Sequence, residues 1–399
     1  NMINNNQIHK ELSNSNIKIT RLCHKLLDDT FLDANGRIKE ELKFKINNPT
    51  QRIQNSKFIG KPEDAFETML FLPSGEGRHG EGGLRTKGYF KHSYKLVDGR
   101  WFIADNDNNP VIPAPEDIQF KIKQYLSSNA QYQTPITELP LISVITVVYN
   151  GAKCLEETIL SVINQTYPNV EYIIIDGGST DTTLDIIKKY EDYIDYWVSE
   201  KDKGIYDAMN KGIDLANGEW INFMNAGDRF SNYSTIINTC ININMNFDVI
   251  YSDVEIDFGK FTVVKKPLIL EKMDLGMTFH HQSCFVKTHL MKQYKFDTTY
   301  KLAADYNFLY TLYQSGNVFY YFNKPISKVI PDGVSDKYRL KVLKEYYRIQ
   351  SSKNKFFPSI YFVYKYLSEL VKLIIKKILP KKLIENIRLY KYRGEIRNF

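Results

Sequence analysis

The chain has 399 residues, 43% of them hydrophobic and 14% aromatic, and it carries a formal net charge of +7. This composition supports a hydrophobic core and excludes a largely disordered protein. Ten Lys or Arg residues against three Glu between residues 365 and 397 account for the whole charge excess. The remainder is neutral overall, which argues against a nucleic-acid-binding protein.

The cysteines and the apolar runs indicate a cytoplasmic protein. The first residues are polar and lack the apolar segment of a secretory signal. No uncharged apolar stretch approaches the roughly 20 residues that a membrane-spanning helix needs. The four cysteines are far apart and form no CxxC pair, which is typical of reduced thiols: Cys23, Cys154, Cys240 and Cys284.

Three regions follow one another along the chain. Residues 2–138 form an N-terminal extension, which is polar and helical at first and then Gly-rich, with a strand expected over residues 101–104. Residues 139–335 carry the strongest pattern of buried strands and helices. Residues 336–399 form a basic, amphipathic and helical tail.

The Gly-rich stretch at residues 74–83 has no hydrophobic pattern. Its five glycines, interleaved with charged residues, are typical of a flexible surface loop. The alternatives are a lid over a substrate or an anion-binding nest that uses Arg78 and Arg85.

Residues 139–230 alternate strands with helices. Residues 141–148 are a continuous apolar and β-branched run, as a strand covered on both faces requires. Helical spacing of apolar residues follows, and further strands are predicted over residues 170–175, 196–198 and 218–224. This alternation predicts an α/β fold with a mostly parallel, doubly wound sheet, which binds ligands at the carboxyl ends of its strands.

Polar clusters stand at those strand ends. Asp176 follows the second strand and can accept hydrogen bonds from a base or a ribose, while residues 177–179 let backbone amides approach a ligand closely. Asp228 follows the strand at residues 218–224 and has the oxygen chemistry of a divalent-metal ligand. The sequence contains neither a GxGxxG after the first strand nor a GxxxxGK[ST], so dehydrogenase and P-loop functions are disfavoured.

Four segments in this order resemble the family 2 glycosyltransferases of GT-A fold, in particular the bacterial branch that builds O-antigen, capsule and other surface polysaccharides: residues 141–150, 176–181, 202–212 and 225–228. The resemblance implies a Rossmann-like GT-A domain over residues 139–335, with helical extensions on both sides. It also implies a UDP-sugar as donor, with the base contacted by Asp176. The nucleotide-sugar contacts that it implies are Thr146, Tyr149, Asp176, Ser179, Asp202, Lys203, Asn225 and Asp228.

The metal motif departs from the family pattern. Two or three carboxylates are usual, whereas Asn225 and Gly227 leave only Asp228. The resemblance implies that Asp228 holds Mn²⁺ or Mg²⁺ together with the diphosphate, and that the metal binds poorly without nucleotide. Metal-independent action stays open, and a turn-capping role for Asp228 is the alternative.

The second half of the domain must bind the acceptor and supply a base. The resemblance implies that Asp305 is the catalytic base of an inverting transfer and takes the proton of the acceptor hydroxyl. His280, His281 and Gln282 would contact the acceptor or the diphosphate. As alternatives, Asp176 and Asp305 could simply cap helices, and the two histidines could be a packed pair.

The tail at residues 360–389 places apolar residues at helical spacing with lysines between them. Such a helix either packs against protein or lies on an anionic membrane surface. The resemblance favours the membrane, because acceptors in this family are often carried on polyprenyl diphosphate. We therefore expect a peripheral protein on the inner face of the cytoplasmic membrane.

These features predict an enzyme, an inverting hexosyltransferase that moves a sugar from a nucleotide sugar to a saccharide or lipid-linked saccharide acceptor in surface-polysaccharide synthesis. One alternative is a sugar nucleotidylyltransferase, which would need a Gly-rich basic loop right after the first strand, where residues 149–152 do not supply one. The other is a non-catalytic nucleotide-sugar-binding module, which the depleted metal motif suggests.

Overall fold

The structure is a computed structural model of the chain. It describes residues 21–25, 30–47, 69–105, 108–128, 136–241, 246–331, 333–353 and 359–380, with a few positions beyond. Much of the first part of the N-terminal extension, which is predicted to be helical, lies outside the described residues. Within it the structure shows one short strand, β1 (His24–Lys25), and one helix, α2 (Glu40–Asn47).

Four parallel strands form the centre of the main sheet: β8 (Ile142–Val148), β9 (Val170–Asp176), β10 (Tyr196–Ser199) and β11 (Trp220–Phe223). They lie in the order β10-β9-β8-β11. The chain thus places β9 and β10 on one side of β8 and then returns to add β11 on the other side. All seven residues of β8 are buried, which explains its unbroken apolar sequence. The predicted α/β, doubly wound arrangement is confirmed.

Helices cover both faces of these strands. The connecting helices are α4 (Leu155–Ile163), α5 (Thr183–Lys189) and α6 (Ile205–Leu215). On one face, Met209 and Ile213 of α6 join the core cluster of Ile145 and Val147. The helices α4 and α5 join the other cluster, which contains the alternate β8 residues such as Val144. The alternation of side chains along β8 thus feeds two cores.

An antiparallel extension continues the sheet beyond β11. In chain order its strands are β12 (Arg229–Phe230), β13 (Val249–Asp257), β14 (Thr262–Lys265), β15 (Cys284–Lys287), β16 (Phe319–Val329) and β17 (Ile396–Arg397). The strand β15 pairs antiparallel with both β11 and β13, whereas β13 and β16 run parallel. The helices of this half are α7 (Thr235–Ile241), α8 (Thr288–Tyr294) and α9 (Ala304–Gln314).

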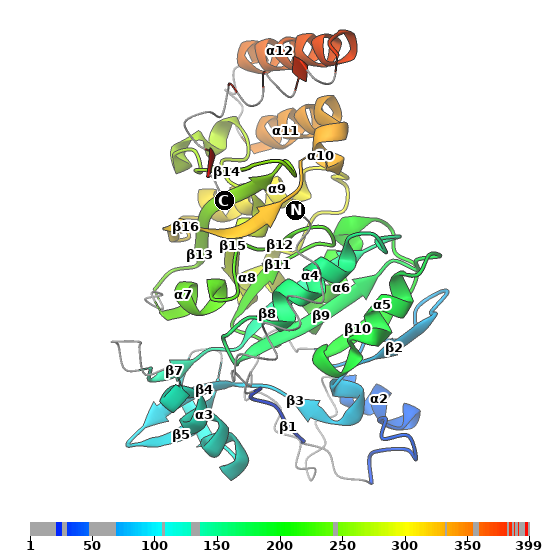
Figure 1. The fold of residues 1–399 in the computed structure, drawn as a ribbon, viewed down its shortest axis with the longest axis vertical. Helices are drawn as coiled ribbons and strands as arrows, with labels where there is room; N and C mark the ends of the chain where they lie inside the picture. The colour runs from blue at the N-terminus through cyan, green and yellow to red at the C-terminus, as the bar shows by residue number, and fades with distance from the viewer. Residues whose placement is uncertain are drawn as a thin grey trace.

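The N-terminal extension packs against the central sheet instead of standing apart (Figure 1). It contains a four-stranded antiparallel sheet in the order β6-β5-β4-β7 and a helix: β4 (Ser93–Val97), β5 (Arg100–Ala104), β6 (Pro110–Pro113), α3 (Glu116–Ser128) and β7 (Glu138–Leu139). The strand predicted over residues 101–104 is confirmed as β5. Two further strands are β2 (Gly80–Gly82) and β3 (Tyr89–Phe90).

The short strand β2 pairs antiparallel with β10 and extends the main sheet at that edge. The prediction of a loop over residues 74–83 is therefore wrong for residues 80–82. Arg85 does not form an anion nest either, because its guanidinium is buried and bonds Glu171 at 2.6 Å and the Leu215 carbonyl at 2.9 Å.

The C-terminal region is helical as predicted over α11 (Arg339–Lys353) and α12 (Ser359–Ile378), but the prediction is wrong for residues 396–397, which form β17 and pair with β14. The short helix α10 (Val334–Lys337) precedes α11. The helix α12, red in Figure 1, lies against α11, and α11 in turn contacts α9. Among the described helices, none combines the length and the apolar character that crossing a lipid bilayer requires.

Candidate active site

The loops that follow β8 and β9 are joined by side-chain hydrogen bonds. Asn150, in a left-handed conformation that Asn tolerates, donates its N–H to Ser179 Oγ at 2.7 Å and accepts the Thr180 N–H at 2.9 Å. The Gly151 N–H donates to Thr183 Oγ1 at 2.9 Å. Tyr149 stands on this rim with 64% of its surface exposed, so its ring is available to a ligand.

Asp176 is completely buried at the end of β9. Its carboxylate accepts hydrogen bonds from Ser199 Oγ at 2.5 Å, from the Ser179 N–H at 3.0 Å and from the Ser179 hydroxyl. Asp176 therefore organises the turn, and a base could reach it only if one of these hydroxyls turned away. Ser199 was not predicted, although it stands beside Asp176 in the parallel ladder, where a neighbouring strand end would be sought.

Thr146 lies apart from this rim. It is completely buried, donates to the Met224 carbonyl at 2.7 Å and lies 3.0 Å from the Tyr172 hydroxyl. Its side chain ties β8 to the residue after β11, which is a packing contact. The geometry gives no support to its predicted ligand contact.

The loop between β10 and α6 brings Asp202 to the same edge of the sheet. Asp202 Oδ1 accepts the Gly204 N–H at 2.8 Å, and the other oxygen lies so close to Gly177 that a Cβ there would be 2.3 Å away. The Lys203 N–H donates to Asp207 Oδ2 at 3.0 Å, and the residue itself is exposed. Gly177 thus permits two loops to touch, whereas its predicted close approach to a ligand stays a prediction.

The segment after β11 carries the proposed metal motif. Asp228 Oδ2 accepts a hydrogen bond from Gln282 Nε2 at 3.0 Å. Burial raises the pKa of Asp228 to about 6, against the opposing effects of the Gln282 hydrogen bond and the charge of His281. Asn225 Oδ1 is buried with no hydrogen-bond partner among the described residues. The unpartnered oxygen of Asn225 and the carboxylate of Asp228 therefore stand at the same strand end.

His281 and Asp305 form a hydrogen-bonded pair. The two lie in the 3₁₀ turn η4 (His281–Ser283) and at the start of α9, with 3.0 Å between His281 Nδ1 and Asp305 Oδ2. His281 Nε2 lies 3.3 Å from Asn225 Nδ2, which links the pair to the metal motif. Asp305 Oδ1 accepts from the Tyr206 hydroxyl and from the Tyr306 N–H, both at 2.9 Å.

Each member of the pair shifts the pKa of the other toward its charged form, against the effect of burial. Burial alone would raise the pKa of Asp305, but the hydrogen bond and charge of His281 bring it below its ordinary value. Burial alone would lower the pKa of His281, but Asp305 raises it. The pKa of His280, by contrast, is lowered to about 3 by burial, so this ring is neutral at pH 7. Of the two histidines, His281 is the one that the structure brings into the cluster.

The chain is similar to known glycosyltransferases. The sequence model described as "Glycosyl transferase family 2" matches residues 143–234. A PGL/p-HBAD biosynthesis glycosyltransferase of Mycobacterium bovis is 30% identical over 175 residues, which cover 42% of this chain and 68% of that protein. The chain belongs to glycosyltransferase family 2.

One further relative and one solved structure are also similar to parts of this family 2 chain. An uncharacterized glycosyltransferase of Mycobacterium tuberculosis is 43% identical over 97 residues, 24% of this chain and 37% of that protein. The chain thus matches little more than a third of that relative's length. The crystal structure of S. aureus TarS 1-349 in complex with UDP is 21% identical, covers 52% of this chain and 65% of that chain, and has a TM-score of 0.42.

The family match spans β8 to β11 and therefore includes Asp176, Asp202 and Asp228. It ends before His281 and Asp305, which the fold returns to the same end of β11 through the antiparallel extension. The N-terminal extension also lies outside the match. The family model thus covers residues 143–234, and the roles proposed for the remaining parts rest on the geometry.

Proposed function

We propose that this family 2 glycosyltransferase moves one sugar from a UDP-sugar to a saccharide or lipid-linked saccharide acceptor, with inversion at the anomeric carbon, in the synthesis of a bacterial surface polysaccharide. The observation that carries the proposal is the link between His281, Asn225 and Asp305 at the carboxyl end of β11. It supports the proposal, because the carboxylate that we propose as base is linked through His281 to the segment that we propose to face the diphosphate. A pure binding module would have no need of that arrangement.

The donor would lie across the rim made by Tyr149, Ser179, Asp202 and Lys203, with its diphosphate toward Asn225 and Asp228. Asp228 and the buried Asn225 Oδ1 are the residues that would hold a Mn²⁺ or Mg²⁺ ion. Together they fit one side of a hard cation, and the diphosphate would have to complete the shell, because the described residues contain no group of three His, Cys, Asp or Glu suited to a metal. The metal would supply positive charge to the leaving diphosphate.

The acceptor hydroxyl would give its proton to Asp305 while its oxygen attacks the anomeric carbon and the bond to the diphosphate breaks. The lowered pKa keeps Asp305 ionised at neutral pH and ready to accept that proton. Tyr206 and His281 hold the carboxylate in place from two sides. Gln282, already bound to Asp228, keeps the acceptor side of the site in register with the metal motif.

The test is a thermal-shift comparison of UDP, GDP and ADP, each with and without Mn²⁺. A ligand that binds the native state raises its stability by mass action, so UDP with Mn²⁺ should give the largest shift. Equal shifts for all three nucleotides, or a preference for GDP, would remove the UDP assignment. Transfer from the preferred nucleotide sugar to a saccharide acceptor then tests the reaction itself.

We further propose that the protein docks on an anionic membrane through α12. The stripe of this helix that faces solvent is apolar, with exposures from 37% for Leu370 to 74% for Ile378: Val363, Tyr364, Leu367, Leu370, Val371, Ile374, Ile375 and Ile378. The opposite side contacts α11, where the rings of Tyr347 and Phe362 lie 4.6 Å apart. Exposed lysines such as Lys372 and Lys377 flank the stripe, which is the charge that an anionic surface attracts.

A further inference from the structure

A cluster of charged side chains lies where the N-terminal extension meets the end of β10, outside the proposed chemistry. Its centre is Glu200, which directly follows β10 and is 4% exposed. Arg78 donates from both Nε (3.0 Å) and Nη2 (2.6 Å) to Glu200 Oε2, and Lys211 of α6 donates to the other oxygen at 2.7 Å. The extension and α6 thus hold one buried carboxylate between them.

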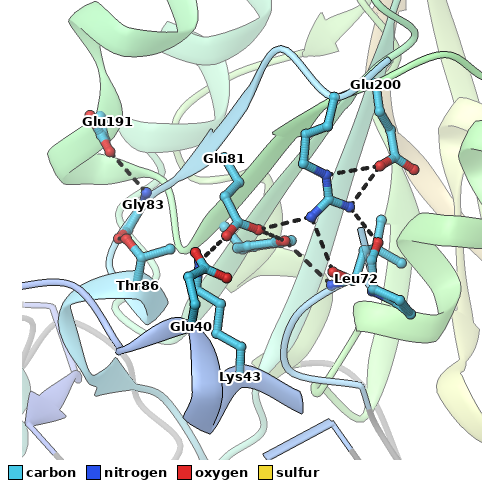
Figure 2. A network of polar contacts seen from close by, with 11 residues as sticks. Glu40, Lys43, Leu72, Glu81, Gly83, Thr86, Glu191 and Glu200 are labelled. Carbon is cyan, nitrogen blue, oxygen red and sulfur yellow. Dashed lines mark hydrogen bonds and ion pairs between the residues drawn. The ribbon is translucent and has the colours of Figure 1, made fainter. Parts of the chain in front are cut away.

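The guanidinium of Arg78 also forms hydrogen bonds with residues close to it in the sequence. It donates to the carbonyls of Leu72 and Pro73 at 3.2 and 2.6 Å and to Glu81 Oε2 at 3.3 Å. Glu81, Glu200 and Leu72, which Figure 2 labels, all accept hydrogen bonds from this group. Such a set of contacts needs the fixed, planar fork of Arg and could not be made by the single point charge of Lys.

The same stretch of backbone reaches the proposed donor loops. The His79 N–H donates to the Ser199 carbonyl at 2.8 Å, and the Glu200 N–H donates to the Asp176 carbonyl at 3.0 Å. One residue beyond, the Lys201 backbone lies against Gly178. The backbone from Ser199 to Asp202 therefore contacts the extension on one side and the loop after β9 on the other.

Lys211 and Arg78 stabilise the ionised form of Glu200. Burial alone would raise the pKa of Glu200, but the hydrogen bonds and charges of Lys211 and Arg78 lower it. The carboxylate stays ionised at neutral pH, so both contacts are charge-assisted.

We propose that Arg78 is a positioning residue for donor binding, which acts through Glu200 to hold the loop of Ser199 to Gly204 against the loop after β9. The extension then completes the nucleotide site from outside the family domain. This inference rests on the proposed function, because the loop matters to the reaction only if a nucleotide binds there. A loop misplaced by even about 1 Å is enough to weaken binding or catalysis markedly.

The experiment measures the Kd of the nucleoside diphosphate that binds wild type tightest among UDP, GDP and ADP, in the presence of Mn²⁺, together with the melting temperature. We expect Arg78→Gln to raise this Kd and the donor KM by about tenfold, with kcat at saturating donor within about twofold of wild type. Arg78→Lys should recover only part of the affinity. The matched control is Lys87→Gln, which removes an exposed ion pair to Asp192 (2.6 Å) in the same extension and should leave Kd unchanged.

A second variant perturbs Glu200 without altering any charge. A Cβ on Gly75 would lie 2.2 Å from Glu200 Oε2, so Gly75→Ala must displace the carboxylate from Arg78. It should raise Kd in the same direction as Arg78→Gln, and it decides the matter if that variant does not fold. Gly333→Ala is its control, because a Cβ there meets nothing within 4 Å.

The outcomes separate this inference from the function on which it rests. If wild type binds none of the three nucleotides, the proposed function fails and the positioning role falls with it. If wild type binds and the folded variants bind equally well, the positioning role alone is wrong. A lower melting temperature with unchanged Kd would likewise overturn it, since Arg78 would then serve only stability.

Discussion

His281 Nδ1 and Asp305 Oδ2 lie 3.0 Å apart, and the other nitrogen of the same imidazole lies 3.3 Å from Asn225. The histidine therefore bridges the side chain proposed as base and the segment proposed to face the diphosphate. In an inverting transfer the base acts on one side of the sugar while the leaving group departs on the other. One ring in contact with both groups fixes the distance between them, which is the requirement of such a reaction.

The role of Asp305 is tested by Asp305→Asn. The amide keeps the shape and most of the hydrogen bonds but accepts no proton at neutral pH. We expect turnover to fall by roughly 10²–10⁴-fold with nucleotide affinity near that of wild type. Asp214→Asn is the control, since the partly exposed Asp214 carboxylate pairs with Lys295 at 2.6 Å and has no proposed role in the reaction. Near-normal turnover in Asp305→Asn would move the base to another residue, with Asp253 or Asp297 next.

The influence of His281 on Asp305 predicts a change in pH dependence. His281 now lowers the pKa of Asp305 against burial, so His281→Asn leaves burial dominant and raises that pKa. A base works above its pKa, and the acidic limb of kcat/KM should therefore move to higher pH in this variant. The limb of His280→Asn should stay in place, because that ring is neutral and does not bond Asp305. An unmoved limb in His281→Asn would show that His281 does not tune the base.

The ionised carboxylate of Asp228 should lower the stability of the fold at neutral pH. Its pKa rises from an ordinary 3.8 in the unfolded chain to about 6 in the fold, so the folded state favours the protonated form. The associated stability is fully present below about pH 4 and is lost as pH rises through about 6. Asp228→Asn should therefore gain roughly 1–3 kcal/mol in urea unfolding at pH 7.5 without metal, and nothing near pH 4.

Asp228→Asn should also lose the contribution of the carboxylate to metal binding. In wild type, Mn²⁺ together with UDP should raise the melting temperature more than UDP alone, and this extra shift should vanish in Asp228→Asn. Thr158→Ser is the control. The Thr158 hydroxyl donates to the backbone carbonyl of Asp228 at 2.7 Å, and the variant leaves the Asp228 carboxylate in place. An extra Mn²⁺ shift that survives in Asp228→Asn would exclude Asp228 as the metal ligand.

The sequence predicted the parts of this site that local patterns determine. The strands β8 to β11 and the ends that carry Asp176 and Asp228 follow from apolar runs and the residues that stop them. The pairing of His281 with Asp305 could not be predicted from spacing, because an antiparallel extension brings those segments together. The strand β2 could not be predicted for a similar reason. Its sequence Gly-Glu-Gly has no strand pattern, and its position depends on tertiary contacts of Arg78 and Glu81.

The apolar stripe of α12 leads to the last prediction. Leu367→Ser, Ile374→Ser and Ile378→Ser together remove apolar surface that is about half exposed or more and keep the face that packs on α11. The triple variant should melt near wild type and no longer sediment with anionic phospholipid vesicles. Wild type should sediment with them at low salt, less at high salt and little with neutral vesicles, because each Lys near the surface is worth about 1 kcal/mol and is screened by ions.

The matched control changes three apolar residues that are exposed elsewhere in the fold, Phe120, Val318 and Ile330, to Ser and should bind vesicles like wild type. Turnover on a short water-soluble acceptor should survive in both triple variants, since no proposed site residue lies in α12. A wild-type protein that ignores vesicles but forms a dimer abolished by the α12 changes would show that a second copy, and not lipid, covers the stripe. A large drop in melting temperature for the α12 variant would instead mean that the stripe packs against the protein itself.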